Sequence, residues 1–285
     1  MNNKSAKLRE AMKQGTVMCP GAWNGLVASA IAQAGFSACY ISGGATANSS
    51  GYPDVGLITL SEMCRTIREV SDASKLPVVV DADTGYGEVE CIARTVVEYE
   101  RNGASAMHIE DQQFPKRCGH LDGKTLVSQS AMCEKIKTAS ENRLSPEFIL
   151  IARTDARGVD GIESAIERGI AYREAGADMI FPEGLRNENE FAEFSKKCPG
   201  LLLANMTEFG KTPHITTSRF EELGYDLVIY PVTFQRVAMR AVTGCLQQLF
   251  QNGSAEGFEQ QMQTRQELYD LLHYVPGEEW RFSNK

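Results

Sequence analysis

Eight short apolar segments recur along this 285-residue chain, and most of them are followed by a segment with apolar residues at helical spacing. The apolar segments are rich in β-branched residues, which favour strands, whereas the helical spacing favours amphipathic helices. The expected strands are residues 17–19, 38–42, 77–81, 104–110, 148–154, 179–183, 201–205 and 227–231. The expected helices are residues 24–34, 60–74, 88–102, 128–140, 161–175, 187–197, 217–223 and 234–251.

Eight such units in one chain predict a (β/α)₈ barrel of the TIM type, a single α/β domain over residues 1–285. A doubly wound open sheet is the alternative, but no Gly-x-Gly-x-x-Gly pattern opens a helix after a strand. Residues 252–285 form a C-terminal helical extension, with helical spacing over residues 258–272. Its apolar positions need a partner, either their own barrel or a neighbouring subunit that exchanges this element.

The overall charge and the cysteine pattern exclude several classes of protein. A net charge of −8 disfavours nucleic acid as a partner. Eight cysteines without a Cys-x-x-Cys pair, in a chain of this size, predict reduced thiols and a cytoplasmic location. The N-terminus leads into a charged amphipathic stretch, and no apolar run is long enough to span a membrane, so we expect no membrane association.

Polar residues stand at or just beyond the carboxyl ends of most of the expected strands. In a barrel these ends meet on one face, which is where barrel enzymes carry their active sites. One such residue is typical of a helix cap or a turn, but so many on one face indicate a functional site. They are Ser42, Gly43, Gly44, Asp81, Asp83, Glu110, Asp111, Arg153, Asp155, Glu183, Asn205, Thr207, Tyr230 and Thr233.

Three of these carboxylates predict a metal site. Asp81 and Asp83 are two residues apart, so an extended backbone points both side chains to the same side. Together with Glu110 they offer an all-oxygen ligand set, which suits Mg²⁺ or Mn²⁺. The structural alternative is a solvated turn before the helix at residues 88–102.

A thiol surrounded by basic residues is the most informative short motif. Lys116 and Arg117 precede Cys118, and Gly119 and His120 follow it. Positive neighbours stabilise a thiolate, so we expect a lowered pKa for Cys118 and a role in moving a proton. His120 either hydrogen-bonds substrate or tunes the thiol, and the glycines of this stretch let it close as a flap. The structural alternative is a solvated basic loop.

Arg153 ends an otherwise apolar strand, where a guanidinium needs a carboxylate partner such as Glu183 or an anionic ligand. With Lys116, Arg117 and Arg236 it forms a cationic set that could hold a small anion. A divalent cation, these cations and a thiol that moves a proton suit cleavage of a carbon–carbon bond beside a carbonyl. The sequence therefore predicts a lyase that acts on a small polycarboxylate.

The motifs, taken in order, resemble the isocitrate lyase and phosphoenolpyruvate mutase superfamily, and within it the methylisocitrate lyases most closely. The likeness covers nearly the whole chain. The motifs lie at residues 40–44, 53–54, 80–85, 108–112, 116–120, 152–155, 181–183, 205–210 and 263–265.

The resemblance implies Mg²⁺-dependent cleavage of 2-methylisocitrate to pyruvate and succinate, in the methylcitrate route of propionate use. It also implies a homotetramer with an exchanged C-terminal helix. Within the site it implies that Asp81 and Asp83 hold the metal with Glu110 nearby, and that Cys118 gives a proton to the succinate carbanion. Tyr40 and Asp54 are the candidates for the base that takes the hydroxyl proton. Substrate contacts would come from Ser42, Gly43 and Gly44, which bind the pyruvate part, and from Arg153, Glu183, Asn205, Thr207 and Arg236.

Three alternatives stay open. A 2,3-dimethylmalate lyase shares the same loop and metal residues, so it is the nearest rival activity. Phosphonate-forming relatives lack the cysteine loop, and such an enzyme would turn over without the thiol. A catalytically silent barrel would act as a binding scaffold, and it predicts gaps among the polar strand ends that this sequence does not have.

Overall fold

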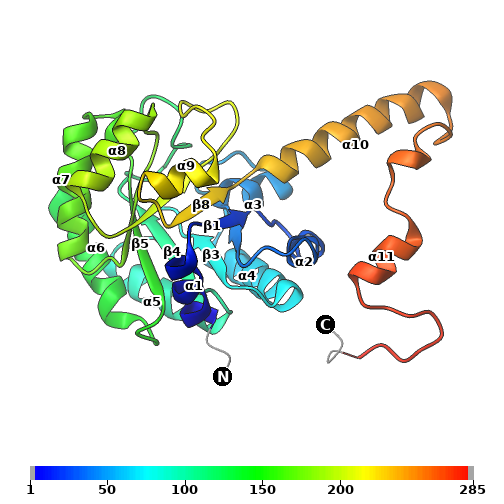
Figure 1. Ribbon diagram of the computed structural model, residues 1–285, viewed down its shortest axis with the longest axis horizontal. Coiled ribbons are helices and arrows are strands. Elements are labelled where there is room, and N and C mark those ends of the chain that lie inside the picture. Colours follow the sequence, from blue (N-terminus) through cyan, green and yellow to red (C-terminus); the bar gives the residue numbers. More distant parts are fainter. Residues whose placement is uncertain (1–3, 282–285) are drawn as a thin grey trace.

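The computed structural model describes residues 4–281 and has eight parallel strands arranged as a barrel with helices around it (Figure 1). The strands are β1 (Val17–Pro20), β2 (Cys39–Ile41), β3 (Val78–Asp81), β4 (Ala106–Glu110), β5 (Ile149–Thr154), β6 (Met179–Pro182), β7 (Leu201–Asn205) and β8 (Leu227–Tyr230). Their order around the sheet is β1-β8-β7-β6-β5-β4-β3-β2. The predicted (β/α)₈ barrel is confirmed. Residues 1–3 and 282–285 of the predicted domain and extension lie outside the described part.

Helices follow the strands in the predicted alternation, most of them within one or two residues of the expected bounds. The helices are α1 (Lys4–Gln14), α2 (Gly25–Gln33), α3 (Gly43–Ser49), α4 (Leu60–Ser74), α5 (Val89–Arg101), α6 (Gln129–Asn142), α7 (Ile162–Glu174), α8 (Glu188–Lys197), α9 (Thr217–Glu222), α10 (Thr233–Asn252) and α11 (Arg265–Leu271). Short 3₁₀ turns lie at Ala156–Gly158 and Glu259–Gln261. Among residues 4–281, no helix combines the length and the apolar character needed to cross a membrane.

The barrel closes between its first two strands through a few contacts at their carboxyl ends. Gly21 forms a parallel bridge with Tyr40. The N–H of Ala22 donates to the carbonyl oxygen of Tyr40 at 2.8 Å. This joint places Tyr40 at the mouth of the barrel.

Helix α1 was expected only as a charged stretch, but it covers the amino-terminal end of the barrel. Leu8 and Met12 are buried with the side chains that fill the barrel interior. Arg9 fixes the helix by donating to Asp178 at 3.0 Å and to the carbonyl oxygen of Glu147 at 2.9 Å. The opposite, carboxyl-terminal end of the barrel contains the cavity described below.

Two layers of core follow from the alternation of side chains along each strand. One set of residues fills the barrel interior, for example Val79, Ile151 and Phe181. The other set, for example Val78 and Val80, packs against the surrounding helices. The strand parity therefore decides which side chains reach the barrel mouth.

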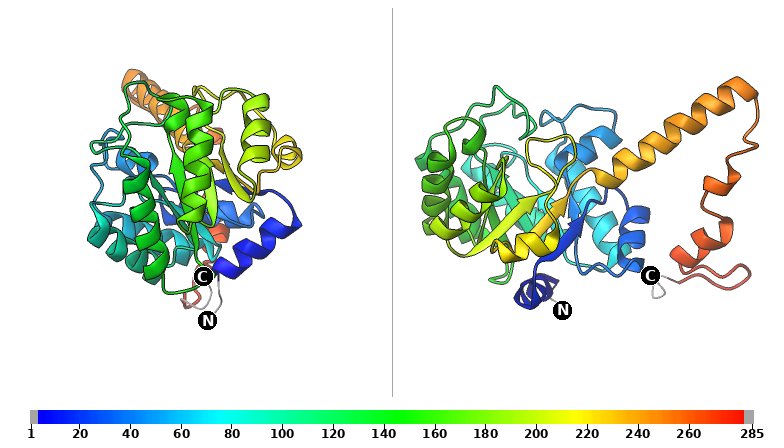
Figure 2. Two further views of the ribbon diagram at one scale, coloured as in Figure 1. Left: turned by 90° about the vertical axis from the view of Figure 1, so that its left-hand side faces the viewer. Right: turned by 45° about the horizontal axis from the view of Figure 1, so that its top comes forward.

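The C-terminal part differs from the prediction in detail. Helix α10 leaves the barrel after β8 and projects away from it, and α11 returns beside α2 (Figures 1 and 2). The expected helix over residues 258–272 is interrupted, because Met262 is extended and Thr264 starts a new helix with a capping box to Glu267. Among the side chains of α10, Val237 and Phe250 are exposed.

Candidate active site

Five strands end in polar side chains that continue the inward-facing row of their strand. Because every second residue of a strand points to the same face, these side chains reach the barrel mouth above the interior core. Asp81, Glu110, Arg153, Glu183 and Asn205 stand two residues beyond Val79, His108, Ile151, Phe181 and Leu203, which are all buried.

These strand ends enclose a cavity of about 180 Å³. Most of the predicted site residues line it: Tyr40, Ser42, Gly44, Asp54, Asp81, Lys116, Cys118, Gly119, His120, Arg153, Glu183, Asn205, Thr207 and Arg236. The other predicted residues, Gly43, Asp83, Glu110 and Arg117, are not among the residues of its wall.

The three predicted metal ligands lie together, and Asp81 is the one of them that lines this cavity. Asp81, Asp83 and Glu110 each offer one carboxylate oxygen, and these oxygens all lie within 4.8 Å of one another. Backbone N–H groups hold Asp81 in place, with Asp83 donating to Oδ1 at 2.9 Å and Gly43 donating to Oδ2 at 3.0 Å. Asp83 itself has a φ of 46°, a left-handed conformation that is uncommon for residues other than glycine.

The acids fit a divalent cation. Glu110 is buried, and neither of its carboxylate oxygens accepts a hydrogen bond from the described residues. Burial raises the pKa of Glu110 well above its ordinary value. Burial, together with the charge of Asp81, also raises the pKa of Asp83 to about 6. Buried acids with free lone pairs are costly unless a cation neutralises them, and oxygen ligands of this kind suit Mg²⁺.

Lys116, which was predicted to bind substrate, lines the cavity, and its ammonium lies between carboxylates. Its Nζ forms ion pairs with Asp54 and, at 2.7 Å, with Asp83. Burial lowers the pKa of Lys116, yet the surrounding carboxylates outweigh burial and raise it well above the ordinary value. Lys116 thus balances part of the negative charge of these carboxylates. It also joins the loop that carries Cys118 to the acid cluster, which consists of Asp81, Asp83 and Glu110.

Arg153 is the central cation of the site, and three carboxylates surround it. It donates to Asp155 from Nε at 2.9 Å and from Nη2 at 3.2 Å. Its Nη1 lies 3.3 Å from Glu110 and its Nη2 lies 3.6 Å from Glu183. The guanidinium also lies over the ring of Phe181, 5.2 Å from the centroid. The predicted carboxylate partner is therefore present, and because Arg153 also lines the cavity, its contact with an anionic ligand stays a prediction.

His120 and Glu183 form a fixed pair on the opposite wall. The backbone N–H of Lys211 donates to Nδ1 of His120 at 3.0 Å, so Nε2 carries the proton and donates to Glu183 at 3.0 Å. Asn205 donates to the same carboxylate at 3.1 Å. Burial opposes ionisation of Glu183, but Arg153 and His120 outweigh it and hold the pKa of Glu183 well below its ordinary value.

Cys118 lines the cavity, but the prediction of a lowered pKa is wrong. Burial raises the pKa of the thiol above its ordinary value, although the backbone N–H of His120 favours the thiolate. The physical reason lies in the neighbouring cations. Lys116 is paired with carboxylates, and Arg117 is exposed, with Nη1 donating to the carbonyl oxygen of Asp122 at 3.4 Å.

The loop between β4 and α6, here called the Cys118 loop, is closed over the cavity by contacts that the sequence did not indicate. Lys124, a buried residue, donates to Asp155 at 2.8 Å and also to the carbonyl oxygen of Gly119. Gln112 fixes the start of the loop by accepting from the N–H of Arg117 at 2.9 Å. The sequence shows only a glycine followed by a lysine at positions 123 and 124, and this common pair did not identify Lys124 as a residue that holds the loop.

The two candidate bases have different environments. Tyr40 is buried, and its hydroxyl lies 2.8 Å from Nε2 of His108. Burial and the charge of Asp81 raise the pKa of Tyr40 well above its ordinary value. Burial also lowers the pKa of His108 to about 4, and its Nδ1 finds no hydrogen bond among the described residues. Asp54 forms an ion pair with Lys116 and lines the cavity.

The glycines after β2 leave no room for side chains. A Cβ at Gly43 would lie 3.0 Å from carboxylate oxygens of Asp81 and Asp83, and one at Gly44 would lie 3.0 Å from Asp54. Ser42 caps α3 by accepting from the N–H of Ala45 at 3.2 Å.

Arg236 of α10 lies at the outer rim of the cavity and is paired with Glu208. Its Nη1 donates to the carbonyl oxygen of Glu208 at 2.7 Å and to the carboxylate of Glu208 at 2.9 Å. Thr207 lies 3.4 Å from the same nitrogen. This cation therefore borders the cavity from the side opposite the acid cluster, and it can meet an anionic group of a bound molecule.

Comparisons with known proteins agree with this geometry. The family model described as phosphoenolpyruvate phosphomutase matches residues 8–250. The chain belongs to the phosphoenolpyruvate phosphomutase family. The resemblance stated from the sequence motifs is thereby confirmed.

Individual members of the family are similar over nearly the whole chain. A 2-methylisocitrate lyase from Aeropyrum pernix is 47% identical over 94% of this chain and 86% of its own length. A 2,3-dimethylmalate lyase from Eubacterium barkeri is 42% identical over 95% of this chain and 94% of its own. A crystal structure of 2,3-dimethylmalate lyase, described as a PEP mutase/isocitrate lyase superfamily member, superposes with a TM-score of 0.90 at 36% identity, covering 95% of this chain and 92% of that one.

Proposed function

We propose that this protein is a carbon–carbon lyase that cleaves 2-methylisocitrate to pyruvate and succinate with the help of Mg²⁺. The observation that carries the proposal is a cavity lined by Asp81, Arg153 and the thiol of Cys118, with the other two acids of the cluster, Asp83 and Glu110, within 4.8 Å of Asp81. The 2-methylisocitrate lyase from Aeropyrum pernix, at 47% identity, supports this substrate. In that role the enzyme serves the methylcitrate route of propionate use.

Asp81, Asp83 and Glu110 would hold the cation. When bound there, Mg²⁺ supplies positive charge that stabilises an oxyanion on the substrate, and Mn²⁺ offers the same chemistry. Arg153 adds a fixed cation beside this point, because its hydrogen bonds to Asp155 keep the guanidinium in place.

Cleavage begins with loss of the proton from the substrate hydroxyl. Asp54 is the stronger candidate for the base, because Tyr40 would first have to lose its own proton against a raised pKa. The carbonyl of pyruvate then forms as the adjacent carbon–carbon bond breaks, and the electron pair passes to the succinate carbon. Cys118 protonates that carbon. Its raised pKa keeps it a neutral thiol before the reaction, which suits an acid.

The remaining residues position the substrate. We assign the pyruvate half to Ser42, Gly43 and Gly44, where the absence of side chains lets a carboxylate approach the backbone. The succinate half would lie toward His120, Asn205, Thr207 and Arg236 on the opposite wall. Lys116 closes the loop over this space, and Gly119 lets the loop lie against Arg153 and Glu183.

The decisive experiment is parallel turnover with 2-methylisocitrate, isocitrate, 2,3-dimethylmalate and oxaloacetate, with and without EDTA, while pyruvate or the other keto acid is followed. We expect the highest kcat/KM with 2-methylisocitrate and loss of turnover in EDTA. A higher value for 2,3-dimethylmalate would establish the rival activity, which the relative from Eubacterium barkeri at 42% identity supports. Binding of 2-methylisocitrate without any product would favour a scaffold protein.

We further propose a cytoplasmic homotetramer in which the C-terminal segment is exchanged between subunits. All eight thiols are free, as expected in a reducing compartment. The apolar side chains of α10, such as Val237, Leu246 and Phe250, are exposed in the single chain and need a cover. Light scattering of the full-length protein tests this, and a monomer would contradict it.

A further inference from the structure

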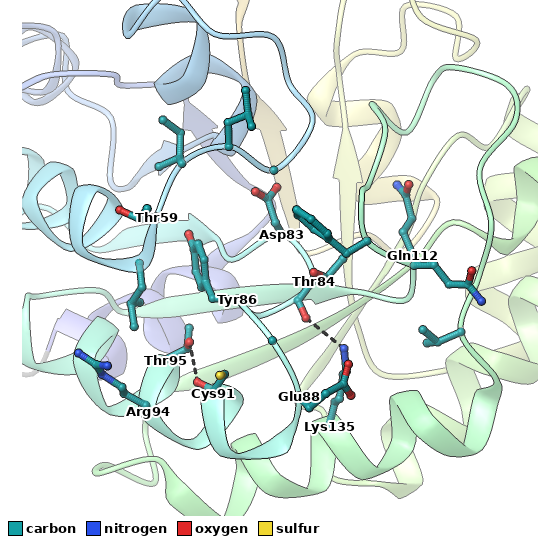
Figure 3. Close-up of a pocket in the computed structure, with 18 residues that line it drawn as sticks. Thr59, Asp83, Thr84, Tyr86, Glu88, Cys91, Arg94, Thr95, Gln112 and Lys135 are labelled. Atoms are coloured by element: carbon teal, nitrogen blue, oxygen red, sulfur yellow. Dashed lines mark hydrogen bonds between the residues drawn. The ribbon is translucent and has the colours of Figure 1, made fainter.

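A second and larger cavity, of about 730 Å³, lies outside the barrel mouth (Figure 3). It is bounded by the loop before α4, the loop between β3 and α5, the first turns of α5, both ends of the Cys118 loop and one side chain of α6. Its wall has no described residue in common with the wall of the first cavity, but it includes Asp83, which belongs to the acid cluster beside that cavity. Its volume falls in the range of small-molecule sites.

One wall of this cavity contains a buried cation without a carboxylate partner. Lys135 of α6 is 5% exposed, and its Nζ donates one long hydrogen bond, 3.4 Å, to the carbonyl oxygen of Thr84. Within residues 4–281, no carboxylate oxygen lies within 4.0 Å of this ammonium, since it takes part in no ion pair. A buried ammonium with so little compensation is costly, and an anion that paired with it would lower this cost.

The other charges of the wall do not neutralise Lys135. Asp83 forms an ion pair with Lys116, on the side of the active site. Glu88 and Arg94 are both exposed and carry opposite charges. The charges of the wall sum to zero, but Lys135 is its one buried cation, and a single ammonium matches one carboxylate better than a doubly charged phosphate.

The rest of the wall is largely apolar. Leu57 and Phe114 border the cavity although they are 50% and 66% exposed, and Ile58, Tyr86 and Val127 continue the same surface. Large apolar side chains that stay exposed around a cavity indicate an apolar ligand body.

We propose that this cavity binds a small monocarboxylate with an apolar body, whose carboxylate pairs with Lys135 and whose body packs against Leu57 and Phe114. This ligand site is separate from the proposed catalytic function, and its test needs no turnover. An aryl-alkyl acid matches both the single charge and the aromatic side chains of the wall.

The test uses 4-phenylbutyrate and its uncharged amide, titrated calorimetrically into the full-length protein. We expect the acid to bind at least about tenfold more tightly than the amide, because only the acid makes a charge-assisted hydrogen bond. Lys135→Met should weaken binding of the acid to the level of the amide, and Lys135→Arg should restore it. Phe114→Ala, at an exposed position, should weaken binding of both compounds.

Cys91 can report independently where the compound binds, because this cysteine is exposed and lines the cavity. Bound 4-phenylbutyrate should slow alkylation of Cys91 by iodoacetamide, measured by peptide mass spectrometry, and leave Cys118 and Cys245 unaffected. Equal binding of acid and amide, unchanged binding in a folded Lys135→Met protein, protection of Cys118 instead of Cys91, or no binding at all would each overturn the proposal.

Discussion

Gly119 lies in the Cys118 loop, where a single added methyl group should disrupt the contact between this loop and the side chains beneath it. A Cβ at this position would lie 2.4 Å from Nη2 of Arg153 and 2.4 Å from Cγ of Glu183. Ordinary contacts of this kind are about 1 Å longer. Arg153 cannot retreat without losing its hydrogen bonds of 2.9 and 3.2 Å to Asp155, so in Gly119→Ala the loop has to move instead.

A displacement of about 1 Å at a catalytic group costs on the order of 100-fold in rate, or about 2.7 kcal/mol of activation free energy. We therefore expect kcat for 2-methylisocitrate to fall by about this factor in Gly119→Ala, because Cys118 moves with the loop. Mg²⁺ affinity, measured by calorimetry, should change much less than kcat, since Asp81 and Glu110 lie on β3 and β4, although Lys116 of the Cys118 loop contacts Asp83. The melting temperature should change little.

The matched control is Gly244→Ala, because a Cβ at Gly244 meets no atom of its own chain within 4 Å; since Gly244 lies on α10, light scattering should show the wild-type assembly for this control. This control should keep wild-type kcat. Wild-type kcat in Gly119→Ala would refute the reasoning, since it would mean that the loop does not carry the catalytic thiol against Arg153. A large loss of Mg²⁺ affinity in the same variant would refute it as well.

Three further predictions concern single functional groups. Cys118→Ser should abolish lysis and leave Mg²⁺ binding intact, and near-normal turnover would argue against the thiol as the acid. Asp81→Asn should weaken Mg²⁺ binding by more than about tenfold in a calorimetric titration, because it removes a charged ligand oxygen. Glu183→Gln should lower the free energy of unfolding by about 3 kcal/mol at pH 7, because it breaks a buried ion pair. The pKa of Glu183 is lowered in the folded protein, so its stabilising contribution is present above the ordinary pKa of 4.5 and is lost as the pH falls below it. In urea unfolding, the difference between wild type and Glu183→Gln should thus be smaller at pH 4 than at pH 7, and an equal or larger difference at pH 4 would contradict this.

Much of the site could be predicted because strand parity is a local property. Once β3 and β4 were assigned, the two-residue repeat placed Asp81 and Glu110 on the interior side, above Val79 and His108. The barrel then brought them together, since all carboxyl ends of the strands meet on one face. The agreement of eight segments in type and order made that barrel the expected fold.

The protonation state of the thiol could not be predicted in the same way. The sequence places Lys116 and Arg117 next to Cys118, and adjacency suggested that both would favour the thiolate. In the folded chain Lys116 turns to Asp54 and Asp83, and Arg117 turns to solvent. A pKa depends on burial and on charges in space, and neighbours along the chain do not report either.

The amino-acid sequence by itself determined the alternation of strands and helices, the barrel that follows from it and the strand-end acids. These depend on periodicity and residue type within short segments. Only the tertiary structure decided which carboxylate each cation meets, how Lys124 closes the Cys118 loop onto Asp155, and that Lys135 lacks a carboxylate partner beside a second cavity. Those features depend on distances between residues far apart in the chain, which packing of the barrel and its helices sets.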